Sequence, residues 1–331
     1  MSDRYALALA LAIGAAALVV PLALLTDYNL FRLTLVATYA LAVLGLNLVM
    51  GFGGQISLGH GAFYAVGSYT TAILIASYDW PYWATFPVSA ALCAGLGFLV
   101  GWPALRLTGP YLALVTLALA TAVPQILKHK TLEDWTGGVQ GVILTKPDPP
   151  FGLPLSPDQW LYLVAFGVAA IGFALVWRLM RGRTGRAIIA VRDNPLAAEA
   201  MGVDVAGLKT RSFALSAMLT GVAGSLGALA VEFVSPDSFT VFLSITLFVG
   251  AIVGGAASIF GAVAGGVFIV AVPPLASMVS KSAPGVAYGA MLILFLYVMP
   301  AGVAGLFRRR RAIGPAVEVP QAKRGRSKDA A

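Results

Sequence analysis

The sequence RGRTGRAIIAVRDNPLAAEAMGVDVAGLKTR, residues 181–211, is the one long polar interruption of an apolar chain in which a short helix can be delimited residue by residue. Asn194 can accept hydrogen bonds from the free amides of a first helical turn, and Pro195 suits the first helical position because it has no N–H to leave unpaired. Gly202 can adopt the left-handed conformation that ends a helix. The stretch therefore predicts a helix of about seven residues, capped at both ends.

A helix this short is marginal alone in water, so it must pack against its own protein, a membrane surface or a partner. Glu199 points away from a side made of small and apolar residues, which leaves a small knob with one charge. The residues on that side are Leu196, Ala197, Ala200 and Met201. Such a surface favours a protein partner over lipid, although an ordinary capped loop helix explains the spacing equally well.

Apolar runs fill most of the remaining chain. Of its 331 residues, 59% are hydrophobic and 11% are charged, with a mean hydropathy of +0.87, whereas about a quarter of the residues in a soluble domain are charged. A helix that crosses a bilayer needs roughly 20 apolar residues. Ten ranges meet or approach this length: Ala6–Leu25, Leu33–Met50, Gly51–Ser77, Ala84–Leu105, Tyr111–Leu127, Trp160–Met180, Ser212–Phe233, Phe239–Gly255, Ile259–Val279 and Gly285–Leu306. We therefore predict an all-α polytopic membrane protein with about ten transmembrane helices in one domain, residues 1–311.

The basic residues gather in two places. Of the 22 Lys and Arg, seven lie between Arg178 and Arg211 and eight lie from Arg308 to the end. Because such residues concentrate in cytoplasmic segments, the polar loop 181–211 and both termini are expected in the cytoplasm. The tail, residues 312–331, is predicted to be a disordered basic segment. The net charge of +8 thus indicates an anionic lipid surface, and not nucleic acid, as its partner.

The stretch GFGGQISLGHGAFYAVGSY, residues 51–69, carries five glycines in its first eleven positions. Glycine weakens a helix, and non-helical backbone survives in a membrane only where protein or a water-filled cavity satisfies it. One interpretation is a bend beside a permeation path, where Asn47, Gln55, Ser57 and His60 offer hydrogen bonds. The other is close helix packing through small residues. A short echo, GGQIS at residue 53 and GGAAS at residue 254, is typical of transporter repeats, but chance explains it too in so glycine-rich a chain.

Residues 128–158 form a polar loop that this topology places on the outer, periplasmic face. Thr136, Gly137, Gly138 and Gly141 predict a tight turn within it. The charges of the loop are mixed, which suits a surface that meets another protein, although a merely solvated loop fits as well.

Groups that enzymes use are scarce. The single cysteine, Cys93, lies in an apolar run, the two histidines, His60 and His129, are isolated, and no predicted span carries paired carboxylates. A phosphate-binding GxxxxGK[ST] motif is absent too. We therefore expect that the chain is not an enzyme, that it binds no metal or cofactor, and that any nucleotide is bound by a partner.

Two long motifs, residues 51–69 and residues 182–226, together with the TGGVQG turn at 136–141, resemble the M-type subunit of the high-affinity branched-chain amino acid ABC-transporter permease family. The resemblance runs over residues 33–306. It implies one permease of a bacterial inner-membrane importer with a second permease subunit, two cytoplasmic ATPase subunits that bind ATP and Mg²⁺, and a periplasmic substrate-binding protein. In such importers a cytoplasmic coupling helix of the permease sits in a cleft of the ATPase. Asn194–Gly202 matches that element, with Glu199, Ala200 and Gly202 at its acidic, small and glycine positions.

The resemblance leaves the cargo open. Leucine, isoleucine and valine are the usual substrates, but similar permeases carry urea, short amides and other amino or aromatic acids. An ion-coupled secondary transporter is the rival class, and the lack of ionisable residues at mid-span disfavours it. A membrane enzyme or structural protein is disfavoured by the missing catalytic groups.

Overall fold

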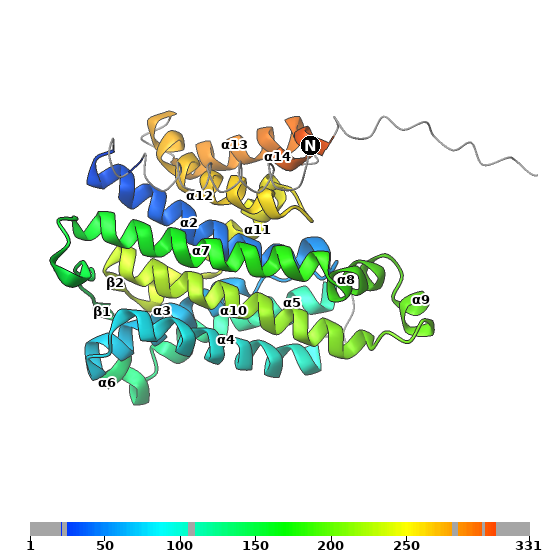
Figure 1. The fold of residues 1–331 in the computed structure, drawn as a ribbon, viewed down its shortest axis with the longest axis horizontal. Helices are drawn as coiled ribbons and strands as arrows, with labels where there is room; N and C mark the ends of the chain where they lie inside the picture. The colour runs from blue at the N-terminus through cyan, green and yellow to red at the C-terminus, as the bar shows by residue number, and fades with distance from the viewer. Residues whose placement is uncertain (1–20, 22–24, 105–109, 280–283, 300–301, 309–331) are drawn as a thin grey trace, which may run out of the picture.

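The computed structural model describes residues 21, 25–104, 110–279, 284–299 and 302–308, and its regular structure there is almost entirely helical (Figure 1). The longer helices are α2 (Asp27–Asn47), α3 (His60–Tyr78), α4 (Tyr82–Ala104), α5 (Pro110–Leu127), α7 (Pro157–Arg181), α10 (Val205–Val231), α11 (Val241–Gly254), α12 (Ile259–Val279) and α13 (Pro284–Val298). The shorter ones are α6 (Glu133–Thr136), α8 (Arg183–Asp193), α9 (Pro195–Ala200) and α14 (Gly302–Arg308), and the strands are β1 (Val142–Ile143) and β2 (Phe233–Val234). A π-helical turn covers Leu48–Phe52, and 3-10 turns cover Lys130–Leu132, Pro150–Gly152 and Pro236–Phe239.

By length and composition, five of the described helical segments can cross a membrane, and a sixth joins them if Tyr111–Leu127 and Lys130–Thr136, which meet at a 63° bend, form one span. The predicted class, an all-α multi-pass membrane protein, is thereby confirmed. Of the ten predicted ranges, the nine from Leu33 onward each overlap a described helix. The first range, Ala6–Leu25, lies almost wholly outside the described residues, and so does the tail 312–331, so the count of ten stays a prediction.

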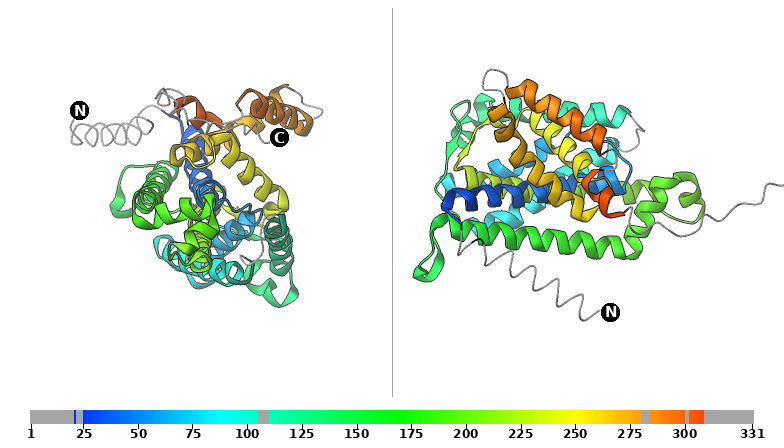
Figure 2. Two further views of the ribbon diagram at one scale, coloured as in Figure 1. Left: turned by 90° about the vertical axis from the view of Figure 1, so that its right-hand side faces the viewer. Right: turned by 90° about the horizontal axis from the view of Figure 1, so that it is seen from above.

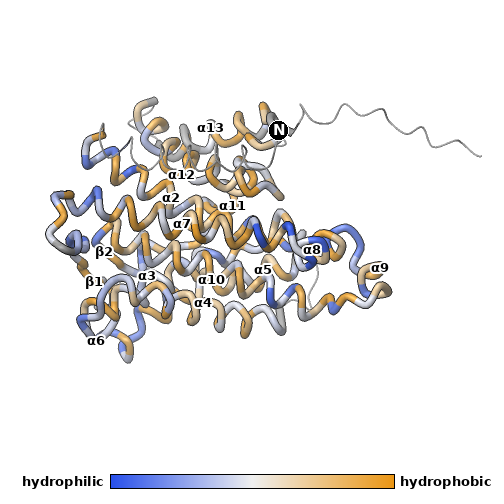
Figure 3. The backbone as a smooth tube through the Cα atoms, in the orientation of Figure 1, coloured by the Kyte–Doolittle hydropathy of each residue, from blue (hydrophilic) through white to orange (hydrophobic). Residues whose placement is uncertain are grey.

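The long helices run side by side, and the polar segments lie at the two ends of the bundle. Figure 3 shows hydrophilic residues around α6 and the start of α7 at one end and around α8 at the other. The paired strands lie with α6, whereas α8 and α9 project beyond the ends of the other helices at the opposite end (Figures 1 and 2). We call these the strand end and the α9 end.

Helix α10 lies at the centre and packs against α2, α3 and α4. Small residues allow α3 and α10 to approach closely, because a Cβ added to Gly67 would collide with the carbonyl of Gly221. Serine hydroxyls then bridge the two backbones in both directions: Ser68 donates to Gly224 O at 2.8 Å, and Ser225 donates to Gly67 O at 3.2 Å. Close packing through glycine, one of the two interpretations of residues 51–69, thus holds for the helical part of that stretch.

The strand end is tied together by the polar loop. Strand β1 pairs antiparallel with β2, and Lys146 lies 3.1 Å from Asp158 Oδ1 and 3.4 Å from Glu232 Oε2. Burial alone lowers the pKa of the Lys146 ammonium, but the hydrogen bonds and negative charges of these two carboxylates outweigh it, so the pKa is raised above 10.5. The predicted tight turn is confirmed, because Gly137, Gly138 and Gly141 all have positive φ.

Candidate functional site

Helix α9 begins and ends where its sequence predicts. The Asn194 side-chain oxygen accepts a hydrogen bond from the Ala197 N–H at 3.0 Å, and Pro195 occupies the first helical position. At the other end, Gly202 has a φ of +83°, which only glycine adopts without strain. The cap and the stop delimit a helix of 6 residues, less than two turns, at the tip of the α9 end.

The surface of α9 is more apolar than solvent exposure favours. Leu196 is 77% exposed and Met201 is 84% exposed, and Ala197, Glu199 and Ala200 are exposed as well. Ala198, by contrast, is buried and anchors the turn. The sequence predicted the exposed side but missed this anchor, because the burial depends on the neighbouring helices α8 and α10.

Helix α8 was not predicted, because residues 181–211 were expected to be a polar loop with one short helix. Gly185, Ile188 and Val191 are buried along one side of it, while Arg183 and Arg186 are exposed. Helix α10 also begins earlier than predicted, at Val205, because the Asp204 carboxylate accepts a hydrogen bond from the Gly207 N–H at 2.9 Å. The polar interruption is therefore largely helical, and α9 is held between two helices.

The second group of predicted site residues lies where α2 unwinds. The helix passes into the π-helical turn Leu48–Phe52 and then into non-helical backbone up to α3, with Gly54 at a φ of +66°. We call residues 48–59 the first break. Two amides near its end are satisfied by side chains of other helices: Leu58 N–H donates to Thr116 Oγ1 and Gly61 N–H donates to Ser244 Oγ, both at 2.9 Å. Of the two alternatives, protein or a water-filled cavity, protein side chains satisfy these two backbone amides.

Asn47 joins this break to another one. Its side-chain nitrogen donates to Ser258 O at 2.8 Å, and its oxygen accepts from the Ala257 N–H at 2.9 Å. Residues 255–258, the second break, separate α11 from α12, and Ala257 has the left-handed φ of +58° there. Asn47, next to the first break, thus contacts the second break, which contains most of the GGAAS half of the sequence echo.

His60 belongs to a directed chain of hydrogen bonds. The Ser216 hydroxyl donates to Gly45 O, so its oxygen must accept from His60 Nε2–H, 2.6 Å away. The other ring nitrogen, Nδ1, lies 3.0 Å from the Ser57 hydroxyl and is hydrogen-bonded to it. All members of this chain are buried, so it fastens the first break to α10.

Gln55 differs from the other three predicted path residues. Its side chain is almost buried, yet its Oε1 has no hydrogen-bond partner. Asn47, Ser57 and His60 are fully engaged with protein groups, whereas Gln55 keeps a free acceptor. That the four residues line a path stays a prediction. Thr116, Ser216 and Ser244, which complete this polar cluster, were not predicted, because they lie on helices distant in the sequence.

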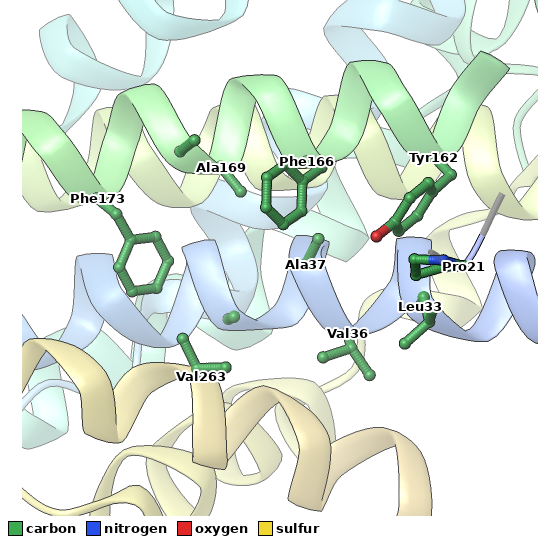
Figure 4. A pocket seen from close by; sticks show the side chains of 11 residues that line it. Pro21, Leu33, Val36, Ala37, Tyr162, Phe166, Ala169, Phe173 and Val263 are labelled. Carbon is green, nitrogen blue, oxygen red and sulfur yellow. The ribbon is translucent and has the colours of Figure 1, made fainter. Parts of the chain in front are cut away.

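An apolar groove lies elsewhere, between α2, α7 and α12, with a volume of about 450 Å³. Figure 4 shows Phe166 and Phe173 of α7 facing Ala37 of α2 and Val263 of α12 across it. Tyr162 supplies the only hydroxyl among the lining side chains. An amino acid zwitterion needs several polar contacts, so this groove suits apolar groups such as lipid chains or helix side chains.

Comparison with known proteins gives a consistent result. The family described as "Branched-chain amino acid transport system / permease component" matches residues 28–299. The high-affinity branched-chain amino acid transport system permease protein LivM of Escherichia coli is 32% identical to the chain over 299 residues, which cover 83% of this chain and 69% of that protein. LivH of Salmonella typhimurium is 26% identical over 292 residues, 82% of this chain and 92% of that one. BraD of Pseudomonas aeruginosa is 26% identical over 293 residues, 82% and 93% of the two chains.

Proposed function

Because the chain belongs to the permease family of branched-chain amino acid transport systems, we propose that it is a permease subunit of a binding-protein-dependent ABC importer and forms part of the path for leucine, isoleucine and valine. The observation that carries the proposal is the family match over residues 28–299, which contains both long motifs and both breaks. The similar proteins LivM, LivH and BraD are named as permeases of this transport system. The protein is a transporter component, and we assign it no catalytic residue.

The complete importer would contain a second permease, two ATPase subunits and a periplasmic binding protein. ATP and Mg²⁺ would be bound by the ATPases, since this chain has no phosphate-binding motif. With the arginine-rich α9 end in the cytoplasm and the strand end in the periplasm, the positive charges face the side that membrane proteins favour. Both termini would then be cytoplasmic in a bacterial inner membrane.

Helix α9 is the proposed coupling helix. It is capped at both ends, it projects from the bundle, and it exposes Leu196 and Met201, apolar side chains that a partner would cover. Asn194, Pro195, Ala197, Glu199, Ala200 and Gly202 complete the surface offered to the ATPase. A stiff capped turn passes on a displacement that a flexible loop would absorb.

The test is uptake by the whole importer in sealed vesicles that contain ATP. Labelled leucine should accumulate when the binding protein is present and should not when ATP is replaced by a non-hydrolysable analogue. Urea, offered in parallel, should not compete with leucine. Uptake that follows an ion gradient and ignores ATP would assign the chain to secondary transport, and preferred uptake of urea would keep the importer but change its cargo.

A further inference from the structure

Arg192, near the end of α8, contacts the first break directly. Its Nη1 donates a hydrogen bond to the Gly51 carbonyl oxygen at 3.4 Å. Its aliphatic stem covers Gly54, where an added Cβ would lie 2.7 Å from Arg192 Cγ. Two residues later along the chain, Asn194 caps α9. One side chain thus spans the distance between the segment that carries α9 and the unwound end of α2.

The Gly51 carbonyl is a natural acceptor for this arginine. Where α2 ends, the amides of Gly53, Gly54 and Gln55 bond back to the carbonyls of Leu48, Met50 and Val49 respectively. Gly51 therefore has a terminal carbonyl that these amides do not use, at the negative end of the helix, where a guanidinium is favoured. Asp193 accepts from the same guanidinium at 2.8 and 2.9 Å and fixes its orientation.

Gly51 passes the contact on to the second break. A Cβ added to Gly51 would collide with Asn47 Oδ1 and with the Ala257 nitrogen, so the three groups are in direct contact. Asn47 holds Ala257 and Ser258 through two hydrogen bonds. A displacement of Gly51 consequently reaches the junction of α11 and α12 without any gap in between.

We propose that Arg192 is a positioning residue that transmits the displacement of α9 to the two breaks. The proposal rests on the proposed function, in which α9 docks on an ATPase. In this proposal Arg192 and the first break move together, so their contact persists while α9 is displaced. The residue touches neither nucleotide nor substrate, and its effect appears in the coupling between ATP hydrolysis and transport.

The first experiment compares Arg192→Ala with Arg186→Ala in the complete importer. Arg186 lies on the same helix and bonds only to the nearby Arg181 carbonyl among the described contacts, so its variant controls for the lost charge. Arg192→Ala should leave co-purification of the ATPase unchanged and lower leucine uptake per ATP hydrolysed by about fivefold or more, the size of an ordinary coupling effect. Arg192→Lys, which keeps the charge but loses the planar fork, should fall between. Equal uptake per ATP in the two alanine variants contradicts the proposal.

A disulfide offers a test by rescue. An added Cβ on Gly54 would lie 3.6 Å from Arg192 Cβ, which is within the range of cysteine pairs that form disulfides. Gly54→Cys combined with Arg192→Cys should be poorly coupled when reduced and should recover coupling when oxidised, because the disulfide replaces the arginine as the link. Cys93 is fully buried and does not compete.

The outcomes separate the two proposals. Gly54 has a φ of +66°, so the Gly54→Cys single variant controls for backbone strain. If that variant is coupled but the oxidised pair with its disulfide is not, Arg192 and the first break do not move together and the inference is wrong. If the unmodified importer shows no ATP-dependent leucine uptake, the proposed function fails first, whatever the variants do.

Discussion

Replacement of Asn47 with leucine tests whether one side chain holds the two breaks together. Leucine is close to asparagine in size, so the change removes the two hydrogen bonds to Ala257 N–H and Ser258 O and creates little empty space. An unpaired backbone amide away from water costs about 1–3 kcal/mol, and a lost second bond costs about 1 kcal/mol. Because Ala257 is partly exposed, water can bond to its freed amide and offset part of this penalty. We therefore expect the free energy of unfolding to fall by about 2 kcal/mol.

The assay is thermal unfolding of the purified chain in detergent, followed by tryptophan fluorescence. A loss of this size should lower the melting temperature by roughly 3 °C in a chain of 331 residues. Thr38→Val is the matched control, since Thr38 is buried on the same helix but bonds only to the carbonyl of Thr34 one turn away. Its melting temperature should change by much less. Asn47→Leu that unfolds at the temperature of Thr38→Val would refute the reasoning.

The same argument predicts an opposite change at Ala257. Its φ of +58° is a left-handed conformation, which costs a non-glycine residue about 1–2 kcal/mol. Ala257→Gly should therefore raise the melting temperature slightly, and it should recover part of the loss caused by Asn47→Leu when the two are combined, because less strain then needs to be held. A double variant as unstable as Asn47→Leu alone would show that the asparagine does not act by holding this turn.

Three further changes give separate expectations. Gly67→Ala should abolish the yield of monodisperse protein, because its methyl group collides with the α10 backbone, whereas Gly167→Ala, which meets open space, should not. Asn194→Ala should weaken α9 by about 1 kcal/mol and reduce ATPase co-purification, and Asn194→Asp should not. Lys146→Met should lower the melting temperature below pH 10.5, because there the folded protein binds the proton of the Lys146 ammonium more tightly than the unfolded chain does. The difference from the unmodified protein should vanish as the pH rises through the raised pKa of Lys146.

Features were predictable from the sequence when the interacting residues lie close together along the chain. The cap at Asn194 and the turn at Gly137 involve residues within four positions, so residue preferences were sufficient. The pairing of Asn47 with Ala257 spans 210 residues, and the bond from His60 to Ser216 spans 156. No local sequence pattern predicts contacts over such separations, so the hydrogen-bond partners of Asn47 and His60 could not be predicted.

Helix α8 was missed in the sequence for a different reason. Only three residues form its buried side. In a segment with so many arginines, an amphipathic pattern of this length is too short to predict a helix. Without this helix the contact of Arg192 could not be predicted, because a loop does not give a side chain a fixed direction. On a helix it has one, and it points at the first break.

The placement of the two breaks follows from what a coupling segment requires. A displaced helix can move its neighbours only if some backbone between them can deform, and continuous helices packed at the density of α3 against α10 cannot. In the proposed mechanism this backbone is that of the two breaks, which interrupt the α-helices at the α9 end and where Gly54 and Gly255 have positive φ. At the strand end, Lys146 and its two carboxylate partners fasten the loop to α7 and the end of α10. If α9 docks as proposed, a push on it would therefore reach the two breaks first, while Lys146 and its partners hold the opposite end, and the push would change the angle between helices before it shifted the bundle as a whole.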